Sequence, residues 1–330
     1  MGTMKTDQSA ALSGLEIKAI GLVVPDAIVT ARNYAHLFGA CSWEFFDLEL
    51  ENSPADRNPG NRSTVRMAST SFGGLKLNLI QPLEGEDSHS RFLTEHGPGI
   101  HHVSFGVTYD HDDRVGRLES AGIGIDMQAN IAGGPVFTYA DTQQALCTRF
   151  EIVQTPSVPG TNVLAPWGDF NTEQKGVVDL TGNQLVQVGF VVDDVERVAD
   201  QYRKLLGIED WNFVEFKSTD TWQGVFHDIP VTGMDFQIRG ALAQSGKIQL
   251  ELLEPVYGTS THNDFLMQHG PGIHHVSFGI ISDYNGILSA MQNDGVVVEM
   301  GGELAGGIWF TYLQTQQPLG TIFEIVRQDV

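Results

Sequence analysis

Apolar and polar positions follow two different periods along the chain. Runs rich in β-branched residues, such as LEIKAIGLVV at 15–24 and NQLVQVGFVV at 183–192, are typical of strands. In VERVADQYRKLLG at 195–207 the apolar positions instead lie on one helical face, and Gly207 is a stop signal for that helix. Further strands are expected at KIQLELLEP (247–255), IHHVSFGI (273–280) and IFEIV (322–326), and a further helix at YNGILSAMQNDG (284–295). The pattern predicts two successive β-α-β-β-β units in this half of the chain.

The chain is an internal duplication. The string HGPGIHHVSFG occurs at 96–106 and again at 269–279, which is 173 residues later. The same offset joins FTYADTQQALCTRFEIV (137–153) to FTYLQTQQPLGTIFEIV (310–326), so Glu151 corresponds to Glu324. The period is too long for a solenoid repeat, and it indicates two tandem copies of a whole domain.

The duplication predicts the division of the 330 residues into domains. We expect a disordered tail over residues 1–14, an N-terminal domain over 15–155 and a C-terminal domain over 184–330. Residues 156–183 lie between them and contain several prolines without sustained periodicity, which is typical of a linker. Four β-α-β-β-β units are therefore expected in the whole chain.

A polar residue recurs among apolar neighbours in several of the predicted C-terminal strands. Strand side chains alternate between faces, so strands that curve around one cavity would bring such residues together. The residues are Gln187, Glu251, His275 and Glu324. One nitrogen and three oxygen donors suit a divalent transition metal with open coordination positions. The alternative is that the His is a capped or partly exposed residue at a strand start and that the acids are edge charges.

The motifs resemble a known family. HGPGIHHVSFG, preceded by ELLEP and followed by a terminal FEIV, resembles methylmalonyl-CoA epimerases and glyoxalase I of the vicinal oxygen chelate superfamily. The resemblance implies an α+β fold with two tandem domains, each made of two βαβββ modules that form an open U-shaped sheet around a cavity. The ligand positions that it implies in the C-terminal domain are again Gln187, Glu251, His275 and Glu324, and this set resembles that of glyoxalase I.

In the N-terminal domain the same resemblance places the four positions at Ala19, Asn78, His102 and Glu151. Alanine has no donor atom and asparagine is neutral, so we expect a degenerate site without a catalytic metal. Arg149 stands two residues before Glu151, and we expect its guanidinium to take the place of a cation there. The first histidine of each pair, His101 or His274, should face the back of the sheet in a structural role.

Composition and charge exclude several classes of function. The net charge of −22 argues against nucleic acid and anionic membranes as partners, and no run is long and apolar enough for a membrane helix. Two cysteines make no disulfide framework, so a cytoplasmic location is expected. The expected partner is a small molecule, and the expected cofactor is one divalent metal among Zn, Ni, Co, Mn, Fe and Mg. Either a monomer or a homodimer is compatible with an internal duplication.

The resemblance predicts a metal-dependent isomerase, epimerase or lyase that acts on a carbon next to a carbonyl. A chelated substrate would pass through a metal-stabilised enolate, with Glu324 or Glu251 moving the proton. A CoA thioester is one candidate substrate. One alternative is an extradiol dioxygenase, although that class uses two histidines and a glutamate. The other is a binding or resistance protein without catalysis.

Overall fold

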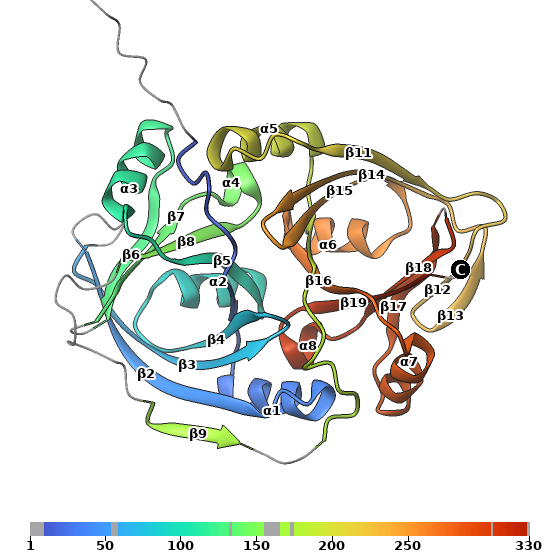
Figure 1. Cartoon of the computed structure of the whole chain (residues 1–330), viewed down its shortest axis with the longest axis horizontal. Coiled ribbons are helices and arrows are strands. Elements are labelled where there is room, and N and C mark those ends of the chain that lie inside the picture. Colours follow the sequence, from blue (N-terminus) through green and yellow to red (C-terminus); the bar gives the residue numbers. More distant parts are fainter. Residues whose placement is uncertain are drawn as a thin grey trace, which may run out of the picture.

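The computed structural model describes residues 10–53, 59–131, 134–154, 166–171, 175–304 and 306–328. It consists of two curled sheets side by side, one from each half of the chain (Figure 1). Each sheet combines two β-α-β-β-β modules through an antiparallel pair at its centre, which is β1–β5 in the first sheet and β10–β16 in the second. The predicted fold class of two tandem α+β domains is confirmed.

The N-terminal sheet has the strand order β3-β4-β1-β5-β8-β7-β6-β2-β9. The first module is β1 (Ala19–Val23), α1 (Ala27–Phe38), β2 (Ser42–Asn52), β3 (Arg62–Phe72) and β4 (Leu75–Glu84). The connecting helix α2 (Ser88–His96) leads to β5 (Gly99–Val107), α3 (His111–Ser120), β6 (Ile125–Ile131), β7 (Val136–Ala140), α4 (Gln143–Leu146) and β8 (Arg149–Gln154).

The C-terminal sheet has the order β11-β14-β15-β10-β16-β19-β18-β17-β12-β13. Its first module is β10 (Gln187–Val191), α5 (Val195–Leu206), β11 (Asn212–Lys217), β12 (Gln223–Phe226), β13 (Ile229–Thr232), β14 (Phe236–Ser245) and β15 (Ile248–Gly258). Its second part is α6 (Thr261–His269), β16 (Gly272–Ile280), α7 (Tyr284–Asn293), β17 (Val298–Leu304), β18 (Ile308–Leu313), α8 (Gln316–Leu319) and β19 (Ile322–Gln328).

The two sheets differ in how they end. In the N-terminal domain β2 pairs with both β3 and β6, so the sheet closes into a barrel. The expected open U is therefore wrong for this copy, because β2 is long enough to reach β6 with Leu50, Glu51 and Asn52. In the C-terminal domain the β12–β13 hairpin pairs with β17 instead, and the sheet remains open.

The predicted helix at 195–207 is confirmed, and its signals explain its bounds. The Asp194 side chain accepts a hydrogen bond from the backbone N–H of Arg197, and Gly207 ends the helix in the left-handed conformation at φ 71°. The equivalent helix α1 begins after Asp26 and ends at Gly39 with φ 74°. Caps and apolar spacing therefore fix the same helix in both copies.

Two predicted boundaries change. Of the expected tail, residues 1–9 lie outside the described residues, but Ala11 and Leu12 are buried in the core, and Leu12 N–H donates to Leu205 O. The segment 10–14 thus packs between the copies instead of forming part of a tail. Of the expected linker, β9 (Gly168–Asn171) pairs with β2, and Leu180 is buried, so this linker is partly built into the fold. Residues 155–165 and 172–174 of the linker region lie outside the residues that the structure describes.

One apolar core spans both domains. Tyr34 on α1 donates through its hydroxyl to Leu319 O, which ends α8 of the other domain, at 3.0 Å. Tyr202 on α5 donates in the same way to Leu146 O, which ends α4, also at 3.0 Å. Helices α1 and α8 thus pack together on one side and α5 and α4 on the other, related by an approximate two-fold axis (Figure 1). In the described part of the chain, each helix is too short or too polar to cross a membrane.

Candidate functional site

The four predicted C-terminal residues lie together inside the open sheet. Nε2 of His275 on β16 is 3.4 Å from Oε2 of Glu251 on β15 and 3.9 Å from Oε2 of Glu324 on β19. It is also 3.4 Å from Oε1 of Gln187 on β10. Four strands from both modules of the C-terminal domain therefore bring three oxygen donors around one imidazole nitrogen.

The strand register explains the convergence. Gly189 on β10 lies opposite Glu251 on the parallel strand β15 and opposite His275 on the antiparallel strand β16. The imidazole of His275 lies over Gly189, where an added Cβ would come within 2.0 Å of the ring atom Cε1. Only a residue without a side chain leaves room for the ring in this position.

Burial sets the charge states at the site. The side chain of His275 is fully buried, and those of Glu251 and Glu324 are 11% and 7% exposed. Burial raises the pKa of Glu324 to about 7, and the nearby Glu251 carboxylate adds to this, while His275 and Ser277 oppose it. Without a cation the site therefore holds a proton on Glu324 up to near neutral pH.

The first histidine of each pair does not face the back of the sheet, so that prediction is wrong. The register between β10 and β16 shifts at Gly189, which is a β-bulge, and a bulge disturbs the alternation of side chains. Nδ1 of His274 consequently lies 3.1 Å from Nδ1 of His275. The N-terminal copy has the same bulge and the same 3.1 Å contact between His101 and His102.

A chain of polar contacts continues from His274 to a carboxylate. Nε2 of His274 lies 3.3 Å from Oγ1 of Thr261, and this hydroxyl donates to Oε1 of Glu299. If His275 binds a metal through Nε2, its Nδ1 carries the proton and donates to His274, which in turn donates to Thr261. Thr261 and Glu299 were not predicted, although their positions correspond to Ser88 and Asp126 in the first copy.

His262, His274 and His275 also have ring nitrogens within 4.8 Å of one another. In His274, however, Nδ1 faces the Nδ1 of His275 and Nε2 faces Thr261, so neither nitrogen is free for a metal. The oxygen donors instead gather around Nε2 of His275. The donor set of Gln187, Glu251, His275 and Glu324 therefore fits a divalent cation better than this group of three imidazoles.

A mainly apolar cavity adjoins the four residues. Glu251, Glu324 and Tyr312 line it, and its remaining walls come from strands β11, β14, β15, β17 and β18 and from His262 on α6. The apolar wall residues are Phe216, Phe236, Ile238, Leu253, Met300, Leu304 and Phe310. A small ligand in this cavity would contact hydrocarbon on most sides and two carboxylates at one end.

The N-terminal copy keeps a cavity but lacks the donor set. His102 and Glu151 correspond to His275 and Glu324, with Nε2 3.8 Å from Oε2, and Asn78 lines the same cavity of about 230 Å³. Oδ1 of Asn78 accepts a hydrogen bond from Ser69, and Ala19 contributes no donor. Fewer oxygen ligands therefore surround the imidazole in this copy.

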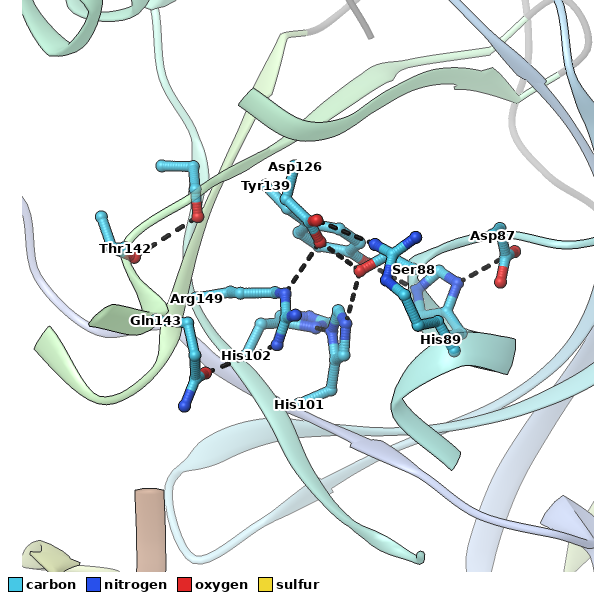
Figure 2. A network of polar contacts seen from close by, with 12 residues as sticks. Asp87, Ser88, His89, His101, His102, Asp126, Tyr139, Thr142, Gln143 and Arg149 are labelled. Atoms are coloured by element: carbon cyan, nitrogen blue, oxygen red, sulfur yellow. Dashed lines mark hydrogen bonds and ion pairs between the residues drawn. The ribbon is translucent and has the colours of Figure 1, made fainter. Parts of the chain in front are cut away.

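Arg149 does not pair with Glu151 as expected. Its Nε lies 2.8 Å from Oδ2 of Asp126, and its Nη1 is 3.4 Å from Oε1 of Gln143 (Figure 2). Arg149 turns to Asp126 because this carboxylate on β6 is nearly fully buried and needs positive charge beside it. Asp126 forms ion pairs with both Arg149 and Arg91, each at 2.8 Å. The guanidinium of Arg149 thus neutralises a different carboxylate.

Comparisons with known proteins agree with this fold. A family model described as the Glyoxalase/Bleomycin resistance protein/Dioxygenase superfamily matches residues 19–138 and 186–312. A search of curated proteins finds no match. The structure of a triple mutant of 4-hydroxymandelate synthase from Streptomyces coelicolor is similar over 96% of this chain and 94% of its own, at 16% identity and a TM-score of 0.57.

Shorter solved structures match about half of the chain. Methylmalonyl-CoA epimerase from Streptomyces coelicolor, in complex with 2-nitronate-propionyl-CoA, covers 45% of this chain and 99% of its own, at 20% identity and a TM-score of 0.34. Methylmalonyl-CoA epimerase from Mycobacterium tuberculosis covers 44% and 88%, at 22% identity and a TM-score of 0.33.

Proposed function

We propose that this chain, which belongs to the Glyoxalase/Bleomycin resistance protein/Dioxygenase superfamily, is a metal-dependent isomerase, epimerase or lyase that acts on a carbon next to a carbonyl. The reaction would take place in the C-terminal domain. The observation that carries the proposal is the pair of buried carboxylates, Glu251 and Glu324, that converge on Nε2 of His275.

Four residues would hold the metal, namely Gln187 through Oε1, Glu251 and Glu324 through carboxylate oxygens, and His275 through Nε2. When bound, a divalent metal supplies a Lewis acid that polarises the substrate carbonyl and favours loss of the neighbouring proton. His275 is held in the required orientation by His274, whose own position is fixed by Thr261.

The two carboxylates would move the proton. Oε2 of Glu251 and Oε2 of Glu324 lie on the same side of the imidazole and at the inner end of the apolar cavity. Burial raises the pKa of Glu324, so this carboxyl is a stronger base than an exposed carboxylate, and the apolar cavity brings the substrate carbon next to it. We assign Glu324 and Glu251 as the groups that remove the proton and deliver it again.

The cavity restricts the substrate. Aromatic and aliphatic side chains surround the space beside Glu251 and Glu324, and they would exclude water from the substrate carbon that loses its proton. The best substrate class is therefore a carbonyl compound whose reacting end is small and apolar, and the acyl end of a CoA thioester is one candidate. An extradiol dioxygenase would be expected to use two histidines and a glutamate, whereas this set has one histidine, with Gln187 at the first position and Glu251 at the second.

Metal analysis tests the assignment of the site. Wild-type protein should contain one divalent ion per chain, His275→Ala should lose it, and His102→Ala should retain it. Two tightly bound ions per chain would contradict the assignment of the N-terminal copy as metal-free. A metal-free wild-type protein after growth with added metals would support a binding protein without catalysis.

Deuterium exchange tests the reaction type. Incubation with candidate 2-substituted thioesters or ketones in D₂O should lead to enzyme-dependent uptake of deuterium at the carbon next to the carbonyl, detected by mass spectrometry. Exchange should continue without oxygen and should be lost in His275→Ala but kept in His102→Ala. Oxygen-dependent turnover of catechols without exchange would instead identify a dioxygenase.

A further inference from the structure

One buried carboxylate has different surroundings in the two copies. In the N-terminal domain Asp126 pairs with two guanidinium groups, that of Arg149 from β8 (Figure 2) and that of Arg91 from α2, each at 2.8 Å. Burial is the largest single effect and would raise the pKa of Asp126, but the charge and hydrogen bond of Arg149, the hydrogen bond from Ser88 and the charge of Arg91 together lower it. The two arginines thus fill the space in front of this carboxylate and balance its charge.

The equivalent carboxylate in the C-terminal domain is Glu299, which lies 173 residues later on β17. It makes the same side-chain contact, since Thr261 donates to Glu299 where Ser88 donates to Asp126. Both guanidinium groups are missing at the equivalent positions. Ile322 replaces Arg149, and Asp264 replaces Arg91.

A cavity of about 590 Å³ lies where the arginines would be. Glu299, Asp264 and Ile322 all line it, together with His227 from the C-terminal domain and His96 from the N-terminal domain. The remaining wall residues are Gly97, Pro98, Thr261, Phe265, Gln268, His269, Gln314, Gln316 and Gln317. None of these residues lines the apolar cavity beside Glu251 and Glu324. The two cavities therefore share no lining residue, and they are linked through the contacts of Thr261 with His274 and Glu299.

Two acidic residues, Glu299 and Asp264, lie at this cavity. Burial raises the pKa of Glu299, the neighbouring Asp264 raises it further, and Thr261 and His227 act in the opposite direction. Among the residues that the structure describes, no Lys, Arg or His side chain lies within ion-pair distance of Glu299. A partly buried carboxylate beside a second acid is costly unless a positive charge joins it.

We propose that this cavity binds a small organic cation through a guanidinium group, in the place that the Arg149 side chain occupies in the first copy. Glu299 and Asp264 pair with the cation, and Ile322 contacts its apolar part. The contacts of Arg149 and Arg91 on Asp126 show that this scaffold accommodates a guanidinium against a carboxylate at this point. The glutamine side chains of the wall offer acceptors for the remaining N–H donors.

Propylguanidine and propylurea provide a matched pair of probes. The two molecules have nearly the same shape and size, but only propylguanidine is charged at neutral pH. Isothermal titration of the full-length, metal-loaded protein should show binding of propylguanidine and no binding of propylurea. Propylammonium should bind more weakly, because an ammonium lacks the planar pair of donors that matches a carboxylate.

Substitutions in the cavity test where propylguanidine binds. Glu299→Gln is nearly isosteric and should weaken propylguanidine binding about tenfold or more, since it removes a charge-assisted hydrogen bond. Ile322→Arg restores the residue of the first copy and should abolish binding, because its own guanidinium fills the place. Asp113→Asn removes an acid whose side chain is 72% exposed on α3, and it should leave binding unchanged.

Several outcomes would overturn the proposal. Equal affinity for propylguanidine and propylurea would show that the cavity does not select for charge. Unchanged binding in Glu299→Gln would place the cation elsewhere, whether or not Ile322→Arg folds. Equal weakening in Asp113→Asn and Glu299→Gln would show a general effect of the net charge of −22.

Discussion

The imidazole of His275 lies over the backbone of Gly189, on the strand next to its own, so closely that an added Cβ would come within 2.0 Å of the ring. Gly189→Ala should therefore displace the ring from the three oxygen donors. We expect loss of the metal from this variant, measured by metal analysis, with a destabilisation of about 1–3 kcal/mol from overpacking.

The first copy provides the control for this change. Gly21 has the same relationship to His102, where the added Cβ would also lie 2.0 Å from the ring. Gly21→Ala should cost a similar free energy of unfolding but leave the metal content unchanged. Loss of metal in both variants would show that the substitution acts through general unfolding and not through His275.

The metal-free protein should lose stability as pH rises through neutrality. Glu324 has a pKa of about 7 in the folded chain, against an ordinary value of 4.5, so the folded state binds this proton more tightly than the unfolded state. The contribution is therefore complete below pH about 4.5 and is lost as pH rises to about 7, with a limit of about 3 kcal/mol. Urea denaturation with a chelator at pH 5 and pH 8 measures it.

Glu324→Gln is the control for the pH effect. The amide does not titrate, so the stability of this variant should change less between pH 5 and pH 8 than that of the wild type. The stability of the metal-free wild type falls as pH rises, but its affinity for metal should increase through pH 7, because the carboxyl of Glu324 loses its proton. Parallel pH profiles for the variant and wild type would assign the titration to another group.

Thr261 should influence the metal although it does not touch the proposed ligands. Its hydroxyl joins His274 to Glu299, and His274 orients His275. Thr261→Val should lower metal affinity about 10–100-fold, which is typical for loss of a group that supports a ligand. Thr261→Ser keeps the hydroxyl and should retain most of the affinity, whereas Ser88→Ala in the first copy should not change metal content.

Two tyrosines should contribute equally to the contact between domains. Tyr34 and Tyr202 are each fully buried, and each donates to a carbonyl at the end of a helix in the opposite domain. Tyr34→Phe and Tyr202→Phe should each cost about 1–2 kcal/mol of unfolding free energy, and the double variant about their sum. Tyr109→Phe, at a side chain that is 99% exposed, should have no effect in the same denaturation experiment.

The fold was largely predictable from sequence because the signals are local and repeated. The caps Asp194 and Gly207, the apolar face of α5 and the alternating strands all act within a few residues. The closure of the N-terminal barrel was not predictable, since it depends on β2 reaching β6, and these strands are far apart in sequence. The packing of residues 10–14 depends on Leu205 and Arg114, which are equally distant.

The proposed ligand positions came together as predicted because the register of four strands follows from regular alternation. The side-chain direction of His274 was mispredicted, since a β-bulge between neighbouring strands leaves no clear mark in one sequence. Glycine at 21 and 189 was the available signal, because a strand glycine often marks a bulge or a close approach. Arg149 was misassigned because its partner, Asp126, lies on a strand that pairs only indirectly with β8.

The crossed packing of α1 on α8 and of α5 on α4 makes the chain equivalent to a dimer whose two subunits can never dissociate. The N-terminal half can therefore lose donor residues from its site without loss of the fold. It must only continue to cover the shared aromatic cluster of Phe38, Phe72, Phe278 and Phe323. Mutations that unfold the N-terminal domain would therefore be expected to abolish activity, as would mutations that remove a proposed metal ligand in the C-terminal domain. Neither half is expected to be soluble when produced alone.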